Sequence, residues 1–321
     1  MRRKLPFILS IIVLIGVVYV LDGINIPTQS RLWREVTNAG HAPLFGVLSI
    51  AMLVFANSLM RRSTEPFHYY LAAGIVSSFL GALTEFIQYF TPRDASVLDM
   101  IYNELGITAF LLLAATFDSR MQKYPSFRNF AGRNVIRATA LIILAGAFIS
   151  FATIALAHAH RKVQFPVICD FDSYLDRNFV VGANARIEFV DPPISWAGNK
   201  SPGAAKWSSD GKRLSAFTIQ YPYPIWTGYQ KFSLEIFSEA EKELLVFLRI
   251  NDVSHNFEFD DRYNKELTIA PGVNRFVIPI LEIEETPGGR QMDLTSIASI
   301  ILFTSGGQEP HAIFVDNIRL E

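Results

Sequence analysis

The sequence predicts two parts: an α-helical membrane bundle of five transmembrane helices, followed by an all-β sandwich domain of the jelly-roll type. Two observations support this division. Residues 1–160 contain long apolar runs and carry 13 Lys/Arg against 8 Asp/Glu, whereas residues 161–321 carry 16 against 22. The second half consists instead of short β-rich segments separated by Gly and Pro turn residues. A basic, apolar half joined to an acidic half is typical of a membrane domain linked to a soluble one.

Five segments are long and apolar enough to cross a bilayer, which takes about 20 mostly apolar residues. We expect transmembrane helices at residues 5–22, 42–60, 68–90, 99–117 and 138–159. The first run follows a basic start, Met-Arg-Arg-Lys, which is typical of a signal peptide. No small-residue cleavage pattern follows it, so we expect this helix to be retained.

The distribution of Lys and Arg predicts the orientation of these helices. The N-terminus and the loops at 61–67 and 118–137 carry ten Lys/Arg, whereas the flanks at 23–41 and 91–98 carry three. The positive-inside rule therefore places the N-terminus in the cytoplasm. We expect a four-helix membrane domain over 1–117, a cytoplasmic loop and fifth helix over 118–160, and an extracytoplasmic domain over 161–321.

Polar residues gather where the third and fourth helices meet on the outer side. Charged groups are costly inside a bilayer and are commonly functional there. Gly74, Ser78, Gly81, Glu85 and Gln88 follow one another at helical spacing, and so do Asp99, Asn103 and Gly106. We expect the two stripes to face each other, since small residues let helices approach closely in lipid. The candidate polar cluster is His41, Glu85, Gln88, Arg93, Asp99 and Asn103.

Three interpretations of this cluster stay open. It can be a clasp that locks the two helices together through pairs such as Arg93 with Glu85 or Asp99. It can be a metal site of His41, Glu85 and Asp99, although the spacing is not typical of zinc. It can be a pocket in which Arg93 holds an anionic head group, with His41 or Glu85 as the acid or base.

The same residues resemble the VanZ-like family of bacterial membrane proteins. The resemblance covers roughly residues 10–117, and its pieces are "NAGHAPLFGVLS" (38–49) and "TEFIQYFTPRDASVLDMIYNELG" (84–106). The second piece matches the family pattern of Glu-x-x-Gln, Arg, and Ser-x-x-Asp-x-x-x-Asn-x-x-Gly. The family's namesake is associated with resistance to the glycopeptide teicoplanin. The resemblance thus implies work in the bacterial cell envelope, at the cytoplasmic (inner) membrane, and no particular reaction.

Eight segments after residue 160 have the composition of β-strands. They are rich in β-branched and aromatic residues and are separated by turn signals such as Pro-Gly (271–272) and Gly-Gly (306–307). Many short strands with no helical pattern predict a β-sandwich. The segments are 185–190, 213–220, 231–238, 244–252, 265–270, 274–281, 297–303 and 312–318.

Residues 165–321 resemble the galactose-binding-like jelly rolls of carbohydrate-binding modules. The pieces that carry the resemblance include "VICDFDS" (167–173) and the closing "AIFVDNIRLE" (312–321). Such domains often hold a structural calcium ion between these two segments, and Asp172 and Asp316 occupy the corresponding positions. The resemblance therefore implies calcium as the one candidate cofactor. Calcium takes six to eight oxygen ligands, of which the sequence indicates only a part.

Sugar binding needs exposed aromatic rings with polar groups beside them. Pro222 and Pro224 interrupt the segment 219–229, which indicates a loop that exposes its aromatic residues. Trp196 and Trp207 are further aromatic candidates. Aromatic residues of a β-sandwich usually lie in its core, so the alternative is that these residues only pack. The candidate ligand-binding residues are Tyr221, Tyr223, Trp226, Asp261 and Arg262.

The function expected from these patterns is that of an envelope protein that presents a glycan- or partner-binding jelly roll outside the membrane. The alternative is a membrane enzyme or lipid-handling protein that acts on a lipid-linked sugar or phosphate at the outer leaflet. No nucleophile elbow, phosphate loop or zinc motif is present in residues 161–321, so we lean against an enzyme. Expected partners are membrane lipid and an envelope glycan or lipid-linked precursor. The charge pattern does not indicate nucleic-acid binding.

Overall fold

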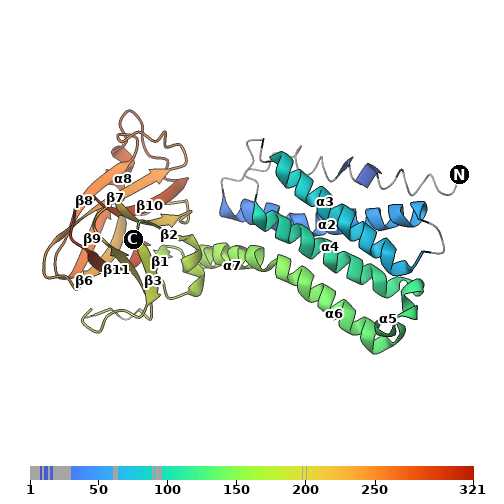
Figure 1. The fold of residues 1–321 in the computed structure, drawn as a ribbon. Helices are drawn as coiled ribbons and strands as arrows, with labels where there is room; N and C mark the ends of the chain where they lie inside the picture. Colours follow the sequence, from blue (N-terminus) through green and yellow to red (C-terminus); the bar gives the residue numbers. More distant parts are fainter. Residues whose placement is uncertain are drawn as a thin grey trace. The chain divides into compact units, whose positions relative to one another are not determined.

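A computed structural model of the chain divides into two compact units, Met1–Ile154 and Ala155–Glu321 (Figure 1). The structure describes residues 8, 11–13, 15–16, 30–60, 64–88, 90, 96–196, 198–199 and 201–321. The fold class predicted from the sequence is confirmed: a helical bundle precedes a sandwich of two antiparallel sheets.

Four helices of the described residues are long and apolar enough to cross a membrane. They are α2 (Arg31–Leu59), α3 (Pro66–Gln88), α4 (Val97–Phe117) and α6 (Phe130–Ala147). The chain is thus a multi-pass membrane protein, as predicted. The further span predicted at 5–22 lies for the most part outside the described residues.

Helix α2 begins eleven residues before the predicted span at 42–60. Ser30 caps it, because its hydroxyl accepts a hydrogen bond from the backbone N–H of Trp33 (3.3 Å). His41 therefore lies inside a helix and not at its start. Pro43 also lies within α2. Polar residues before residue 42 interrupt the apolar run, so the length of that run did not predict this first part of the helix.

The span predicted at 138–159 is divided between two helices. Helix α6 ends at Ala147, Phe148 is its C-cap, and α7 covers Ile149–Gln164. The segment predicted as a loop at 118–137 contains η2 (Ser119–Lys123), α5 (Pro125–Arg128) and the start of α6. Asn129 starts α6 early, since its side chain accepts from the N–H of Gly132 (2.6 Å).

Glycines bring the membrane helices close together. A Cβ atom placed on Gly106 of α4 would overlap the backbone carbonyl of Ala42 on α2. A Cβ on Gly81 of α3 would lie 3.2 Å from the Nδ2 atom of Asn103 on α4. The predicted stripes on α3 and α4 thus meet at Gly81 and Asn103. Gly106, however, serves the contact of α4 with α2, which the sequence did not indicate.

Eleven strands of the described residues form the two sheets of the sandwich. Sheet A has the order β3-β4-β11-β6-β9, with β1 also paired to β11, and sheet B has the order β2-β5-β10-β7-β8. Sheet A contains β1 (Val167–Cys169), β3 (Arg186–Val190), β4 (Ala204–Ser209), β6 (Lys231–Ser238), β9 (Gly272–Pro279) and β11 (His311–Leu320). Sheet B contains β2 (Val180–Ala183), β5 (Ser215–Gln220), β7 (Leu244–Asp252), β8 (Tyr263–Ile269) and β10 (Ile297–Thr304).

The core of the sandwich lies between the two sheets. Alternate residues along a strand point to opposite faces, so every second residue of β7, from Leu244 to Ile250, is buried. Large aromatic side chains fill the centre, among them Trp207, Trp226 and Phe232. The short helix η3 (Tyr174–Phe179) precedes β2 and the short helix α8 (Ile280–Glu285) follows β9, and both of these strands lie at an edge of their sheets. This unit therefore has a hydrophobic core of its own.

The last turns of α7 belong to the same unit as the sandwich. Arg161 on these turns is only 3 % exposed. Its guanidinium lies 3.6 Å from the centroid of the Phe179 ring and donates to the carbonyl of Gln220 (3.0 Å). The compact unit therefore starts inside α7, a few residues before the predicted boundary at 161.

Candidate functional site

The outer face of sheet B carries an aromatic pair at its centre. Phe247 of β7 and Phe303 of β10 lie directly opposite each other in the strand register. Their ring centroids are 5.2 Å apart and the rings are nearly parallel, at 20°. Both point away from the core, because the residues on either side of them in each strand are buried or face the other sheet. Each ring is half-buried and keeps one part open to solvent.

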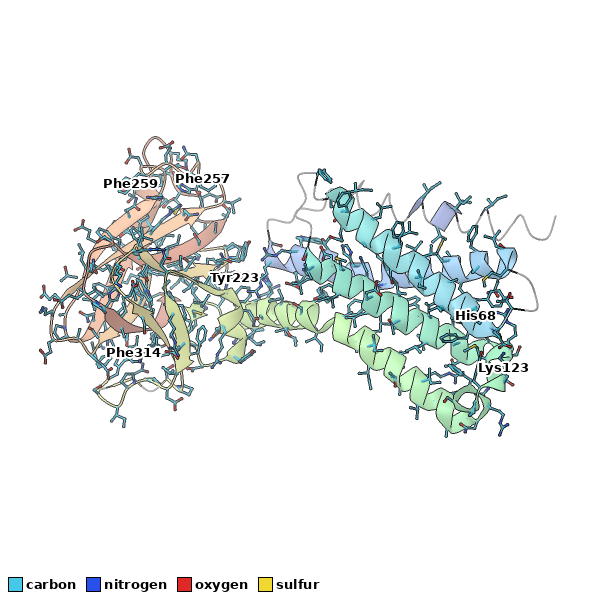
Figure 2. The ribbon with its side chains drawn as sticks, in the orientation of Figure 1. His68, Lys123, Tyr223, Phe257, Phe259 and Phe314 are labelled. Carbon is cyan, nitrogen blue, oxygen red and sulfur yellow. The ribbon has the colours of Figure 1, made fainter. Side chains whose placement is uncertain are left out.

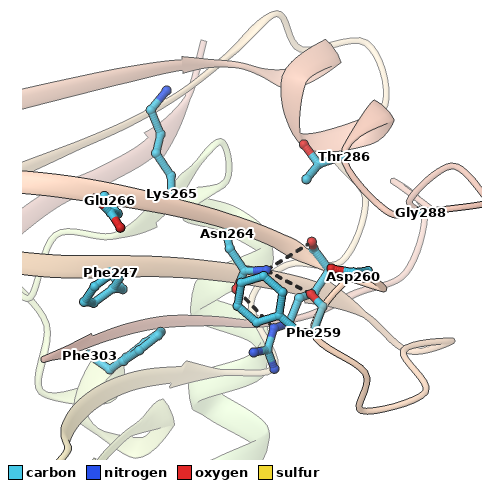
Figure 3. Close-up of a pocket in the computed structure, with 10 residues that line it drawn as sticks. Phe247, Phe259, Asp260, Asn264, Lys265, Glu266, Thr286, Gly288 and Phe303 are labelled. Carbon is cyan, nitrogen blue, oxygen red and sulfur yellow. Dashed lines mark hydrogen bonds between the residues drawn. The ribbon is translucent and has the colours of Figure 1, made fainter. Parts of the chain in front are cut away.

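These two rings form one wall of a hollow of about 610 Å³ (Figure 3). Asn264 and Glu266 of β8 stand on the same outer face, with Glu266 opposite Phe247 in the register. Arg262, just before β8, also lines the hollow. An aromatic floor with a few convergent polar groups is the usual composition of a small-molecule site.

The loop between β7 and β8 forms the rim of this hollow. Phe257 and Phe259 stand on it with 87 % and 64 % of their surfaces exposed (Figure 2). The guanidinium of Arg262 lies 5.1 Å from the ring centroid of Phe259, a cation–π contact. The Asn264 side-chain amide donates to the backbone carbonyl of Phe259 (3.0 Å). Phe259 is thus held against Arg262 and Asn264, which line the hollow.

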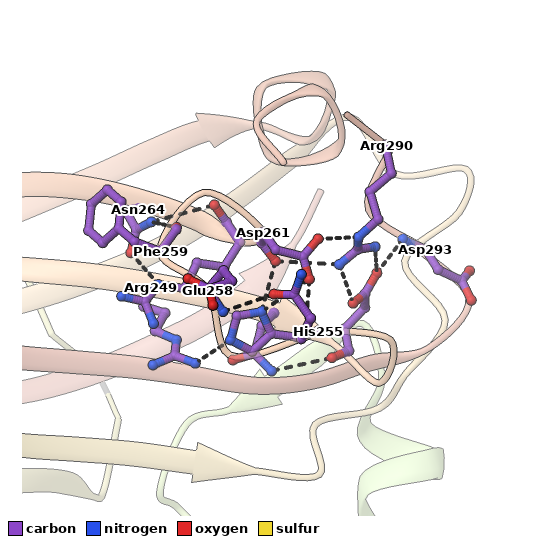
Figure 4. A network of polar contacts seen from close by, with 12 residues as sticks. Arg249, His255, Glu258, Phe259, Asp261, Asn264, Arg290 and Asp293 are labelled. Carbon is purple, nitrogen blue, oxygen red and sulfur yellow. Dashed lines mark hydrogen bonds and ion pairs between the residues drawn. The ribbon is translucent and has the colours of Figure 1, made fainter. Parts of the chain in front are cut away.

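An ion-pair network holds this loop at its base (Figure 4). Arg290 donates from Nη1 and Nη2 to the two carboxylate oxygens of Asp252, at 2.5 and 2.9 Å, and from Nε to Asp261. Asp261 also accepts from the backbone N–H of Asn256 (2.8 Å). Hydrogen bonds from Arg290 and Asn256 lower the pKa of Asp261 to about 2. Asp261, predicted as a ligand contact, is therefore engaged within the fold.

Of the other predicted ligand residues, Arg262 lies in the hollow, and Tyr221 and Tyr223 do not line it. Tyr221 follows β5 with a positive φ of 50°. The ring of Tyr223 packs on Phe165, with the centroids 4.3 Å apart. Both side chains are half-buried in the loop that follows β5.

Trp226 is buried, and the prediction of an exposed platform there is wrong. Its side chain is 0 % exposed and stacks on Phe232 at 5.4 Å. The indole N–H donates to the carbonyl of Tyr223 (3.0 Å), which satisfies its one polar atom. Trp196 and Trp207 are buried as well, at 3 % and 0 % exposure. Burying a large aromatic side chain stabilises the fold more than exposing it on a loop. Trp226 therefore packs in the core, although the neighbouring prolines indicate a loop.

Sequence reasoning missed Phe247 and Phe303. A signal for them exists in the strand pattern "LLVFLRIND" (244–252), where Phe247 and Arg249 alternate with residues that face the core. The alternation alone does not show which outward positions of different strands become neighbours. That requires the pairing of β7 with β10, whose residues lie about 50 positions further along the chain.

The structure brings the two predicted calcium ligands near each other. Asp316 is fully buried, and Ser201 donates to Asp172 while Asn199 donates to Asp316 (2.8 Å). Burial, together with the charge of Asp172, raises the pKa of Asp316 to about 7. Carboxylates are the oxygen ligands that calcium prefers. Among the described residues, however, no three His, Cys, Asp or Glu side chains gather as a metal site, so the calcium ion stays a prediction.

The polar residues of the bundle also come together in part. The His41 Nδ1 atom lies 3.0 Å from the Asn103 Oδ1 atom, and both residues are buried. Asp99 is close enough to His41 to interact electrostatically, and Glu85 accepts from the backbone N–H of Ser96 (3.2 Å). Gln88 is buried on α3. Arg93 lies outside the described residues.

In the described part of the chain, Asp99 Oδ1 and Asn103 Nδ2 are buried without a hydrogen-bond partner. The cluster does not line the hollow on sheet B, nor a hollow beside Asn57 and Arg120, nor one beside Thr227 and Leu281. The metal site of His41, Glu85 and Asp99 finds no support, because the described residues contain no such three-ligand group. The clasp and the pocket both remain as interpretations.

Comparison with solved structures finds that the sandwich is similar to carbohydrate-binding modules. A family 11 carbohydrate-binding module from Clostridium thermocellum, in complex with a β-1,3-1,4-mixed-linked tetrasaccharide, is 20 % identical over 48 % of this chain and 93 % of the module, with a TM-score of 0.36. A family 11 module of a cellulosomal cellulase from the same organism is 18 % identical, over 48 % of this chain and 92 % of the module, with a TM-score of 0.35. An exo-β-agarase is 16 % identical, over 48 % of this chain and 24 % of the agarase, with a TM-score of 0.39.

No protein-family model matches the chain, and no curated protein matches it. At the identities and TM-scores found, the similarity to solved structures does not transfer a ligand to this protein. The VanZ-like resemblance of residues 10–117 stays a prediction.

Proposed function

We propose that this protein is a multi-pass membrane protein of the bacterial cell envelope that presents a glycan-binding β-sandwich outside the cytoplasm. The observation that carries the proposal is the stacked pair of Phe247 and Phe303 in the hollow on sheet B. The C–H faces of a sugar ring pack well on aromatic rings, and sugar hydroxyls need polar neighbours. Asn264, Glu266 and Arg262 supply such neighbours within the same hollow.

The test is a glycan array probed with the full chain in phosphatidylcholine nanodiscs, followed by titration of the strongest hit. We expect Phe247→Ala and Phe303→Ala each to weaken binding about tenfold, because each removes one face of the stacking surface. Tyr174→Ala is the matched control, since Tyr174 is an aromatic residue with 70 % exposure that lies outside sheet B. An array that stays silent, or equal losses in all three variants, would overturn the proposal.

The proposed orientation follows from the Lys/Arg distribution and has its own test. The one native thiol, Cys169, is 0 % exposed, so an introduced cysteine can be labelled against a low background. Ser305→Cys places a thiol on an exposed turn of the sandwich, and Gln122→Cys places one beside α4. In intact cells with a permeable outer envelope, a membrane-impermeant maleimide should label only the first. Labelling of Gln122→Cys alone would reverse the topology.

A second candidate function lies in the helical bundle, in the residues that carry the VanZ-like resemblance. Asp99 Oδ1 and Asn103 Nδ2 are buried without described partners, which favours a polar ligand such as the head group of a lipid-linked sugar or phosphate. Native mass spectrometry with a polyprenyl phosphate tests this. Binding that is lost in Asn103→Ala, while Asn57→Ala on the far part of α2 retains it, would support a lipid-handling role. No retained lipid would leave the cluster as a clasp.

A further inference from the structure

Two arginines stand beside the aromatic pair on the outer face of sheet B. Arg249 lies two residues after Phe247 on β7, so the two side chains share a face about 7 Å apart. Arg249 lies opposite Asn264 of β8 in the register, and Arg262 is two residues before Asn264. Arg262 and the aromatic pair thus line one hollow, and Arg249 lies beside the pair on the same face of β7.

Each of these guanidiniums is positioned by a neutral acceptor. Arg249 donates from Nη2 to the Nε2 atom of His255 (2.8 Å), and Arg262 donates from Nε to the Oδ1 atom of Asn264 (3.1 Å). A guanidinium only donates, so His255 must carry its ring proton on Nδ1, where it faces the carbonyl of Asp261 (2.9 Å). A guanidinium has five N–H donors, so most of the donors of both side chains are left for another partner.

No carboxylate of the described residues forms an ion pair with Arg249 or Arg262. Asp260 and Glu266 line the same hollow but pair with neither guanidinium. Burial and the neighbouring charge of Arg262 both lower the pKa of Arg249, so its charged form is not balanced within the fold. Three other arginines of the sandwich have acidic partners: Arg186 with Glu188, Arg275 with Glu235, and Arg290 with Asp252 and Asp261.

We propose that the glycan bound on sheet B carries an anionic group, a carboxylate or a sulfate or phosphate ester, which the guanidiniums of Arg249 and Arg262 hold while the sugar ring stacks on Phe247 and Phe303. Guanidinium groups match the geometry of such oxyanions and bind them with two parallel hydrogen bonds. The inference rests on the proposed glycan-binding function, whose ligand class it narrows.

The experiment titrates the full chain, in nanodiscs of zwitterionic phosphatidylcholine, with three soluble polymers. Polygalacturonate carries carboxylates, dextran sulfate carries sulfate esters, and mixed-linked β-glucan is neutral. We expect one acidic polymer to bind more tightly than the neutral one, and its affinity to fall as salt rises. Arg249→Gln and Arg262→Gln should each weaken that binding about 10- to 100-fold, and should weaken any binding of the neutral glucan far less, because the neutral glucan has no anionic group for the guanidiniums to hold.

Arg275→Gln is the matched control, because Arg275 is an arginine of sheet A that lies away from the hollow. Equal losses in Arg275→Gln would reveal unspecific attraction and overturn the inference. Binding of the neutral glucan alone, unaffected by both arginine variants, would overturn the anionic ligand and leave glycan binding intact. If none of the three polymers binds and the glycan array shows no hit, both the glycan-binding function and the anionic ligand are overturned. If the protein binds vesicles of anionic lipid more tightly than any of the three polymers, the arginines bind a membrane surface and the inference of an anionic glycan is wrong.

Discussion

Arg290 and Asp252 form a two-point ion pair at the base of the loop between β7 and β8, with N–O distances of 2.5 and 2.9 Å. Asp252 is the last residue of β7 and its side chain is 0 % exposed. A second carboxylate, that of Asp261 near the other end of the loop, receives the Nε donor of the same arginine. One side chain therefore fixes both ends of the loop that carries Phe257, Phe259 and the approach to Arg262.

Replacing Arg290 should release the loop between β7 and β8 and lower the free energy of unfolding of the sandwich. Arg290→Ala leaves the buried carboxylate of Asp252 without its partner, which costs about 3 kcal/mol of unfolding free energy. Urea denaturation of residues 155–321 measures the loss, since this unit has its own core. Arg290→Lys keeps the charge but not the two-point geometry and should fall between wild type and Arg290→Ala. An unchanged midpoint in Arg290→Ala would contradict the role assigned to the network.

Asp316 should make the stability of the sandwich fall as the pH rises from about 4 to about 7. Its pKa is about 7 in the folded domain, against an ordinary value of 3.8, so between these values the folded state binds the extra proton. The loss amounts to at most about 4 kcal/mol, at about 1.4 kcal/mol for each pKa unit. Denaturation midpoints of residues 155–321 across this range measure it. Asp316→Asn should flatten the profile, and the same slope in the variant would refute the assignment.

If Asp172 and Asp316 bind one calcium ion together, calcium should stabilise the folded sandwich. Binding to the folded state alone raises its stability, by about 2.7 kcal/mol at a hundred times the dissociation constant. We expect added calcium to raise the thermal midpoint of residues 155–321 at pH 7 and to lose this effect in Asp172→Asn. Asp210→Asn, in an exposed turn, is the control. No shift with millimolar calcium would mean that the hydrogen bonds from Asn199 and Ser201 hold the acidic pair without an ion.

Trp226 should matter for stability and not for the ligand. Trp226→Ala removes a large buried side chain from the core and should lower the free energy of unfolding by about 3–5 kcal/mol. Trp226→Phe keeps most of the packing against Phe232, so it should fold and bind the same glycan with unchanged affinity. Circular dichroism follows the unfolding, and the titration of the best glycan follows binding. A folded Trp226→Phe with strongly reduced affinity would return Trp226 to the site.

Gly106 should be indispensable for the contact of α4 with α2. Gly106→Ala places a methyl group on the backbone carbonyl of Ala42, and overpacking of this kind costs about 1–3 kcal/mol. Gly146→Ala is the control, because a Cβ there meets nothing within 4 Å. Thermal unfolding of the full chain in detergent compares the two. Equal midpoints would show that the helices can separate at this point without loss.

The sequence indicated eight of the eleven described strands well, because each combines β-branched residues with clear turn signals. Segments 231–238 and 244–252 match β6 and β7 residue for residue. The strands β1, β2 and β4 escaped prediction. The first two are only 3 and 4 residues long, and β4, "AAKWSS", has no β-branched residue. Pairing with neighbouring strands, and not local propensity, makes these segments extended.

The candidate site was harder to predict than the fold. The aromatic pair depends on the register of β7 against β10, which no local pattern gives. Trp226 and Asp261 carried the chemistry expected of sugar contacts, yet one fills the core and the other is held by Arg290. In the bundle, helical spacing did place Gly81 near Asn103, because a single helix face is a local property.

The burial of all three sandwich tryptophans gives the domain a spectroscopic property. Trp196, Trp207 and Trp226 are each no more than 3 % exposed, whereas the rings that border the hollow belong to phenylalanine. Indole emission from residues 155–321 will be blue-shifted in the native domain and will move to longer wavelength only when water reaches the core. A glycan that settles on Phe247 and Phe303 will leave this emission unchanged. Intrinsic fluorescence thus reports whether a variant is folded, independently of whether it binds.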